Sequence, residues 1–163
     1  MKDATQSPAP APPLAMLAEP TRDEARLLGA DAVLLIARIL TPAQLKEYLY
    51  TAWSLGMDAL IEVHDEADMQ SALATPAEFI GINNRNLVTF QTSIQQTLDL
   101  LPQADFSRTL ISESGVFTAD DANILQQAGC DGILVGEGLV RAPDIGAQTR
   151  ALTRIKQSIA ESA

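Results

Sequence analysis

The sequence predicts an α/β fold with about five parallel strand and helix units, and two observations support it. A glycine, any residue and an aspartate precede a short apolar run three times, over residues 29–36, 56–63 and 129–136. In each copy the glycine suits a left-handed helix C-cap, and the run has the length of a strand without polar alternation. Helix-start signals lie between the apolar runs. Apolar strands that alternate with helices form a parallel sheet covered by helices.

The first part of the chain differs in composition from the rest. Five of the nine prolines lie within the first 20 of the 163 residues, among Ala, Ser and Gln. This composition predicts a disordered, Pro/Ala-rich lead over residues 1–22. The prolines also interrupt any apolar core of a signal peptide. We therefore expect the folded domain over residues 23–163.

The expected elements follow one another regularly through this domain. The apolar runs predict strands over residues 32–36, 59–63, 79–84, 108–114 and 132–136. A helix begins after the first strand, with Thr41 as N-cap and Pro42 in the first turn. Another helix begins after Thr118. Each strand is thus followed by a segment that returns the chain to the start of the next strand.

Polar residues at the carboxyl ends of the expected strands favour a barrel over a doubly wound open sheet. Successive strand ends converge on one mouth in a closed barrel, whereas an open sheet has one crevice at its switch point. We therefore predict a partial TIM (β/α)8-type barrel over residues 23–163. The polar strand ends are Glu62 and His64, Asn83 to Arg85, Glu113 and Ser114, and Gly136 and Glu137.

Charge and cysteine content exclude several classes of partner. With 11 Lys and Arg against 21 Asp and Glu, the net charge of -10 disfavours nucleic acid and anionic membrane surfaces. No stretch has the roughly 18 apolar residues of a membrane span. Cys130 is the single cysteine, so no intrachain disulfide forms, and we expect it buried in a cytoplasmic protein. The sequence has no cluster of Cys and His residues that would predict a metal site.

Glycines after the last two expected strands predict a phosphate site. They occur in Glu113–Val116 and in Val135–Gly138. A glycine at such a turn lets a phosphate approach backbone N–H groups closely. In barrels, the loops after the last two strands often form a phosphate site together with a short helix. Either glycine alone would be equally well explained by turn geometry.

Glu62 and the string Asn83–Asn86 are the candidates for reaction chemistry. A glutamate inside an apolar strand costs desolvation unless it faces a polar cavity or a partner, and such a carboxylate suits acid and base catalysis. The amides and Arg85 suit an anionic ligand with hydroxyl groups. The alternatives are that Glu62 pairs structurally with Arg85, that the amides form only a turn, and that His64 caps the next helix.

Four strings in order resemble consecutive motifs of indole-3-glycerol phosphate synthase. They are residues 58–66, 80–87 with Thr89 and Phe90, 111–116 and 134–137. The resemblance covers about residues 24–151 and corresponds to strands four to eight of that family's TIM barrel. It implies the decarboxylating ring closure of 1-(2-carboxyphenylamino)-1-deoxyribulose 5-phosphate in tryptophan biosynthesis. It also implies a small phosphorylated substrate, and neither a metal nor an organic cofactor.

The resemblance also implies roles for individual residues. Glu62 would be a catalytic acid/base carboxylate, Asn83 would hold the substrate's hydroxyl and ring region, and Glu113 would line the reaction site. Arg85 would support the substrate loop. Phosphate would be bound, mainly through backbone N–H groups, by Ser114, Gly115, Gly136 and Glu137.

One part of the family pattern is missing. The family places a lysine general acid at the end of strand three, whereas this chain has only Lys2, Lys46 and Lys156, none at an expected strand end. We therefore expect little or no activity from the chain alone. The absence of the family's first three strands would leave two open sheet edges and an exposed barrel interior, so we also expect self-association, a complementing barrel fragment, or poor stability. The alternatives are a non-catalytic phosphate-binding or assembly module, and another phosphate-binding barrel, such as an isomerase with catalytic Asp residues. The string Asn83–Arg85 with Glu62 argues against the isomerase.

Overall fold

The computed structural model describes residues 20–153 and contains one parallel sheet in the order β1-β2-β3-β4-β5. The expected strands and the α/β class are confirmed, although β2 begins one residue early and the last three strands are shorter than expected. Most of the predicted lead, residues 1–22, lies outside the described residues. The strands are β1 (Ala32–Ile36), β2 (Asp58–Val63), β3 (Phe79–Asn83), β4 (Thr109–Glu113) and β5 (Gly132–Leu134).

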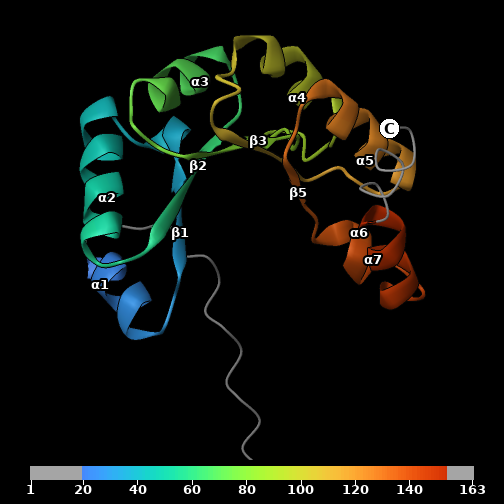
Figure 1. Ribbon diagram of the computed structural model, residues 1–163, viewed down its shortest axis with the longest axis horizontal. Helices are drawn as coiled ribbons and strands as arrows, with labels where there is room; N and C mark the ends of the chain where they lie inside the picture. Colours follow the sequence, from blue (N-terminus) through green and yellow to red (C-terminus); the bar gives the residue numbers. More distant parts are fainter. Residues whose placement is uncertain (1–19, 154–163) are drawn as a thin grey trace, which may run out of the picture.

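Helices cover one face of a strongly curved sheet (Figure 1). Each strand pairs with the next in sequence, so the strand order never reverses, as it would in a doubly wound sheet. Right-handed crossovers then put the helices on the same convex side. The helices are α1 (Pro20–Leu27), α2 (Pro42–Ser54), α3 (Glu66–Leu73), α4 (Gln95–Leu100), α5 (Ala119–Ala128), α6 (Glu137–Val140) and α7 (Ile145–Thr153), with 3-10 turns η1 (Ala37–Ile39) and η2 (Leu101–Gln103).

The expected helix ends are confirmed by the backbone geometry. Gly29, Gly56 and Gly129 have φ angles of 88°, 69° and 108°, in the left-handed region that an L side chain rarely adopts. Thr41 and Thr118 accept hydrogen bonds from the backbone of the first turns of α2 and α5, and both form capping boxes. Local sequence therefore sets where α2 and α5 begin and where the helices before β1, β2 and β5 end.

The hydrophobic core lies between the convex face of the sheet and the helices. Alternate strand residues point to this side and are almost fully buried. Leu45 and Leu49 of α2 and Leu125 of α5 are fully buried as well. Strand residues on this side include Val33, Leu35, Ile61, Ile80 and Leu110.

The concave face of the sheet is less well covered. Register places Leu34, Leu60 and Phe79 in one row on this face, and each is only partly buried. Leu134 of β5 is 49% exposed. The face that would line a closed barrel thus carries accessible apolar side chains. Within residues 20–153, no helix has the length and apolar character required to cross a membrane.

Candidate active site at the carboxyl ends of the strands

Three predicted site residues meet at the ends of adjacent strands on the concave side. Glu62 is the last residue of β2 that points to the concave side, and it pairs in register with Gly81 of β3. Asn83 of β3 pairs with Glu113 of β4. A Cβ atom on Gly81 would lie 1.7 Å from Glu113 Oε1. Gly81 therefore leaves the space that the Glu113 carboxyl occupies. The sequence offered one signal for this role, a glycine inside a strand, which often marks a close approach.

The carboxylate of Glu62 is held by Asn83. Asn83 Nδ2 donates to Glu62 Oε2 at 3.0 Å, and Asn83 Oδ1 accepts from the backbone N–H of Arg85 at 2.9 Å. The second bond fixes the orientation of the amide, so its NH₂ group faces Glu62. The alternative that Glu62 pairs structurally with Arg85 is wrong, because the Arg85 guanidinium bonds Glu137 instead.

Glu113 is a buried carboxyl group beside a second carboxyl. Burial, followed by the charge of Glu62 and a hydrogen bond with Glu62, raises its pKa to about 8. Its Oε1 atom has no hydrogen-bond partner among the described residues. At neutral pH Glu113 therefore holds a proton that can be shared with Glu62.

His64 follows β2 directly and is buried behind Glu62. Its Nε2 atom lies 3.4 Å from Glu62 Oε1. The alternative that His64 caps the next helix is wrong, because Asp65 is the N-cap of α3 and accepts from the backbone N–H of Asp68. Asp65 competes better for this position because a short carboxylate reaches the first-turn N–H groups easily.

Asn84, next to Asn83, faces the other side of the sheet. Its Nδ2 donates to Ser112 Oγ at 2.8 Å and to the carbonyl of Ser114 at 3.0 Å. Its Oδ1 accepts from both the backbone N–H and the hydroxyl of Thr97. This buried network attaches α4 to β4 and fixes the backbone from which Asn83 and Arg85 project.

The five predicted substrate- and phosphate-binding residues line one pocket of about 220 Å³. Ser114 and Gly115 both have left-handed φ angles, 63° and 71°, and turn the chain at the pocket's edge. The N–H of Ser114 already donates to the Leu134 carbonyl at 3.3 Å. The N–H groups at the start of α6 have no partner within their helix. The residues in question are Arg85, Ser114, Gly115, Gly136 and Glu137.

A pair of arginines surrounds the carboxylate in this pocket. Arg85 Nη2 lies 2.8 Å and Arg141 Nη2 3.2 Å from oxygens of Glu137. The hydrogen bond from Arg85, followed by the charge of Arg141, lowers the pKa of Glu137. Glu137 thereby neutralises part of the positive charge that would attract an anion.

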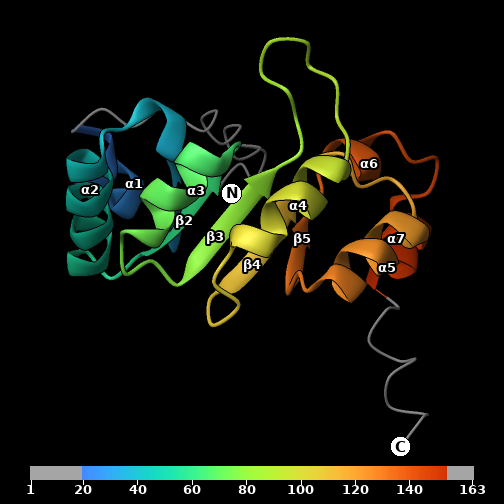
Figure 2. The same ribbon diagram turned by 90° about the horizontal axis from the view of Figure 1, so that it is seen from above.

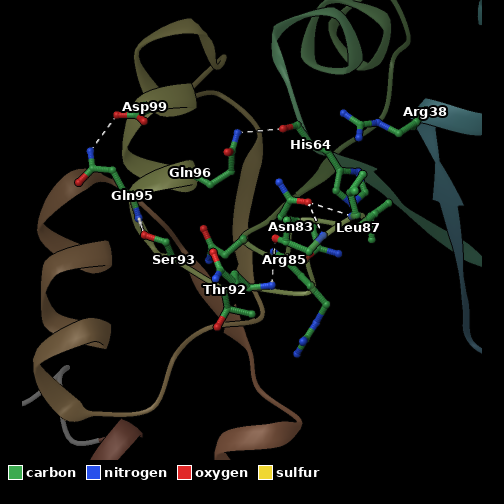
Figure 3. A pocket seen from close by; sticks show the side chains of 15 residues that line it. Arg38, His64, Asn83, Arg85, Leu87, Thr92, Ser93, Gln95, Gln96 and Asp99 are labelled. Carbon is green, nitrogen blue, oxygen red and sulfur yellow. Dashed lines mark hydrogen bonds between the residues drawn. The ribbon is translucent and has the colours of Figure 1, made fainter.

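The connection between β3 and α4 forms a second pocket of about 410 Å³. This connection projects from the rest of the molecule (Figure 2), and Arg85 Nη1 supports it by donating to the Phe90 carbonyl at 3.2 Å. His64, Asn83 and Arg85 all lie along the pocket (Figure 3). The pocket thus adjoins the carboxyl cluster.

Comparison with known proteins gives the family. The sequence model of indole-3-glycerol phosphate synthase matches residues 16–152. This chain belongs to that family. Indole-3-glycerol phosphate synthase of Variovorax paradoxus is 48% identical over 129 residues, which are 79% of this chain and 48% of that protein. That of Bordetella pertussis is 45% identical over 128 residues, 78% of this chain and 49% of that protein.

The chain spans about half the length of these indole-3-glycerol phosphate synthases. Among solved structures, a 3-hexulose-6-phosphate synthase matches with a TM-score of 0.69 at 16% identity, over 84% of this chain and 67% of that one. Thiamine phosphate pyrophosphorylase from Pyrococcus furiosus matches with a TM-score of 0.64 at 18% identity, over 85% and 65%. These matches show the fold alone, which is of the TIM-barrel type, as expected.

Two other expectations concern Cys130 and metals. Cys130 is buried as expected. Burial, followed by the charge of Asp131, raises the pKa of its thiol to about 11, which disfavours a reactive thiolate. Among residues 20–153, no group of three or more His, Cys, Asp or Glu side chains is arranged to hold a metal.

Proposed function

We propose that this chain supplies the half of an indole-3-glycerol phosphate synthase site that carries Glu62, Asn83 and Glu113. The reaction would be the decarboxylating ring closure of 1-(2-carboxyphenylamino)-1-deoxyribulose 5-phosphate in tryptophan biosynthesis. One observation carries the proposal. Two carboxyl groups and an amide meet at adjacent strand ends beside a glycine-lined pocket.

The carboxyl pair suits the proton transfers of this reaction. The aromatic carbon that bears the carboxylate bonds to the ketose carbon, CO₂ leaves, and the former ketone oxygen leaves as water after protonation. One proton is also lost from the carbon next to nitrogen. Glu62 would transfer protons as acid and base, and Glu113, protonated at neutral pH, would line the site and share its proton with Glu62. Asn83 would orient Glu62 and a substrate hydroxyl.

The 220 Å³ pocket would take the phosphate. Backbone N–H groups of Gly115, Gly136 and Glu137 suit a phosphate, because they supply positive dipoles to an acidic protein. Arg85 would then exchange part of its contact with Glu137 for the phosphate. The proposed reaction consumes no oxidant or reductant and requires no cofactor.

We propose that the chain alone has little activity. Lys46 is the only lysine in residues 20–153 and lies on α2, away from the strand ends. A missing proton donor for the ketose oxygen typically costs about 10²- to 10⁴-fold in rate. The exposed concave face suits self-association or a complementing barrel fragment. The missing lysine also favours the second candidate, a non-catalytic module that binds a phosphorylated ligand.

The test is a fluorescence assay of indole-3-glycerol phosphate formation by the purified chain. The chain is assayed alone and with a family fragment that carries strands one to three. We expect turnover only with the fragment, abolished by Glu62→Gln and kept by Glu47→Gln, an exposed change on α2. Turnover by the chain alone would contradict the role of the missing lysine. No turnover, together with retained phosphate binding, would favour the non-catalytic module.

A further inference from the structure

His64 is the only histidine of the chain, and both of its ring nitrogens are buried without a hydrogen bond in the described part of the molecule. Its side chain is 4% exposed. Each ring nitrogen nevertheless faces a carboxylate. Nε2 lies 3.4 Å from Glu62 Oε1, and Nδ1 lies 3.7 Å from Asp68 Oδ2. A ring N–H directed at either of these oxygens would give that buried nitrogen a polar partner.

The backbone of His64 is held at both of its polar groups. Its N–H donates to Asp68 Oδ2 at 3.0 Å. Its carbonyl accepts from Gln96 Nε2 at 2.8 Å (Figure 3). The ring can therefore move only by side-chain rotation. Burial of the side chain, which is only 4% exposed, restricts this rotation, so the ring is suited to hold a neighbouring group in place.

Asp68 is in turn held by Arg38, a residue that follows the first strand. It is buried on α3, and Arg38, which follows β1, places Nε 3.5 Å from Asp68 Oδ2 and also pairs with Asp65. The charged groups that face His64 are thus Glu62 on one side and Asp68 on the other, with Arg38 behind Asp68. The row begins at the end of β1 and ends at the proposed catalytic carboxylate.

We propose that His64 is a positioning residue for Glu62, and that Asp68 and Arg38 hold its ring in place. His64 fixes Glu62 Oε1 while Asn83 fixes Oε2, so the carboxylate is held from both sides. The catalytic consequence rests on the proposed function, whereas the contact itself does not.

The contact is tested first by NMR on the whole chain labelled with ¹⁵N-histidine, in which one residue gives all the signals. We expect Glu62→Gln to shift the Nε2 signal most and Asp68→Asn to shift the Nδ1 signal most. Glu66→Gln, a matched carboxylate change nearby on α3 whose side chain bonds Gln103, should move neither. An Nε2 signal that does not respond to Glu62→Gln would overturn the proposal.

The consequence is tested in the complemented assay with two replacements of similar size. The Gln amide in His64→Gln can still donate to Glu62, whereas His64→Leu cannot. We expect His64→Leu to lower kcat about 10- to 100-fold with little change in KM, as misplacement of a catalytic group does. His64→Gln should recover most of kcat. Equal rates for the two variants would overturn the positioning role. If the complemented wild type has no activity, the proposed function fails, and the NMR result still decides the contact.

Discussion

The two faces of the sheet differ in how completely their apolar side chains are buried and their polar side chains are hydrogen-bonded. On the convex face, strand side chains such as Leu110 are fully buried under helices, and the polar group of Asn84 is fully hydrogen-bonded. On the concave face, Leu134 remains 49% exposed. In the described residues, the three buried side-chain atoms that lack a hydrogen bond belong to His64 and Glu113, at the mouth of the concave side.

This difference indicates which face contributes most to stability and which one is suited to the proposed site. Apolar burial and satisfied hydrogen bonds stabilise a fold, whereas unpaired buried polar atoms and shifted pKa values cost stability and are common at functional sites. The convex face therefore holds the chain together. The concave face is the one on which we propose that a substrate or a further protein segment binds.

The largest expected effect comes from removing matched leucines from the two faces. Leu110→Ala, in the fully buried convex core, should lower the free energy of unfolding by about 2–5 kcal/mol. Leu134→Ala should cost less than about 1 kcal/mol, because little of its area is buried. Urea titrations at several protein concentrations measure both. A cost for Leu134→Ala that grows with concentration would show that self-association covers the concave face.

The next effect is a pH dependence of stability that arises from Glu113 at the carboxyl ends of the strands. The pKa of Glu113 rises from 4.5 to about 8 on folding, so the folded state binds the extra proton between these values. The contribution of Glu113 to the free energy of unfolding is therefore greatest below about pH 4.5. It falls as the pH rises to about 8, by at most about 1.4 kcal/mol per pH unit. Glu113→Gln should remove this decline, as measured by urea titrations across this range. Exposed Glu47→Gln should retain it, and an unchanged slope in Glu113→Gln would contradict the assignment.

Two glycines of the concave face offer a matched comparison. Gly81→Ala would place a methyl group on the Glu113 carboxyl, and it should destabilise the chain by about 1–3 kcal/mol and displace that carboxyl. Gly132→Ala meets nothing closer than Ile111 Cγ1 at 3.6 Å and should change stability little. Thermal unfolding of both variants measures the difference. Equal melting temperatures would show that Glu113 moves away at no cost.

The smallest expected effect concerns the charged pair at the 220 Å³ pocket. Arg85→Ala should cost less than about 1 kcal/mol of stability, because the contact with Glu137 is partly exposed. It should nevertheless weaken the stabilisation of the chain by inorganic phosphate. Arg141→Ala, whose side chain is 78% exposed, is the control and should keep most of that stabilisation. Thermal shifts with and without phosphate distinguish the two, and equal losses would argue against a special role for Arg85.

The sequence by itself determined the strands, the helix ends and the strand ends that carry polar groups. These features depend on residues a few positions apart: a glycine at a left-handed turn, Thr41 or Thr118 before a helix, an apolar run of strand length. The motifs also identified the family, which the comparisons confirm.

Only the tertiary structure decided which side chains meet. Asn83 and Glu62 are 21 residues apart, and Arg85 and Glu137 are 52 apart, so strand register and side-chain rotamers choose these partners. Sequence reasoning therefore left Arg85 as a possible partner of Glu62 and His64 as a helix cap. It also could not show that Gly81 makes room for Glu113, because that space exists only when β3 and β4 lie side by side.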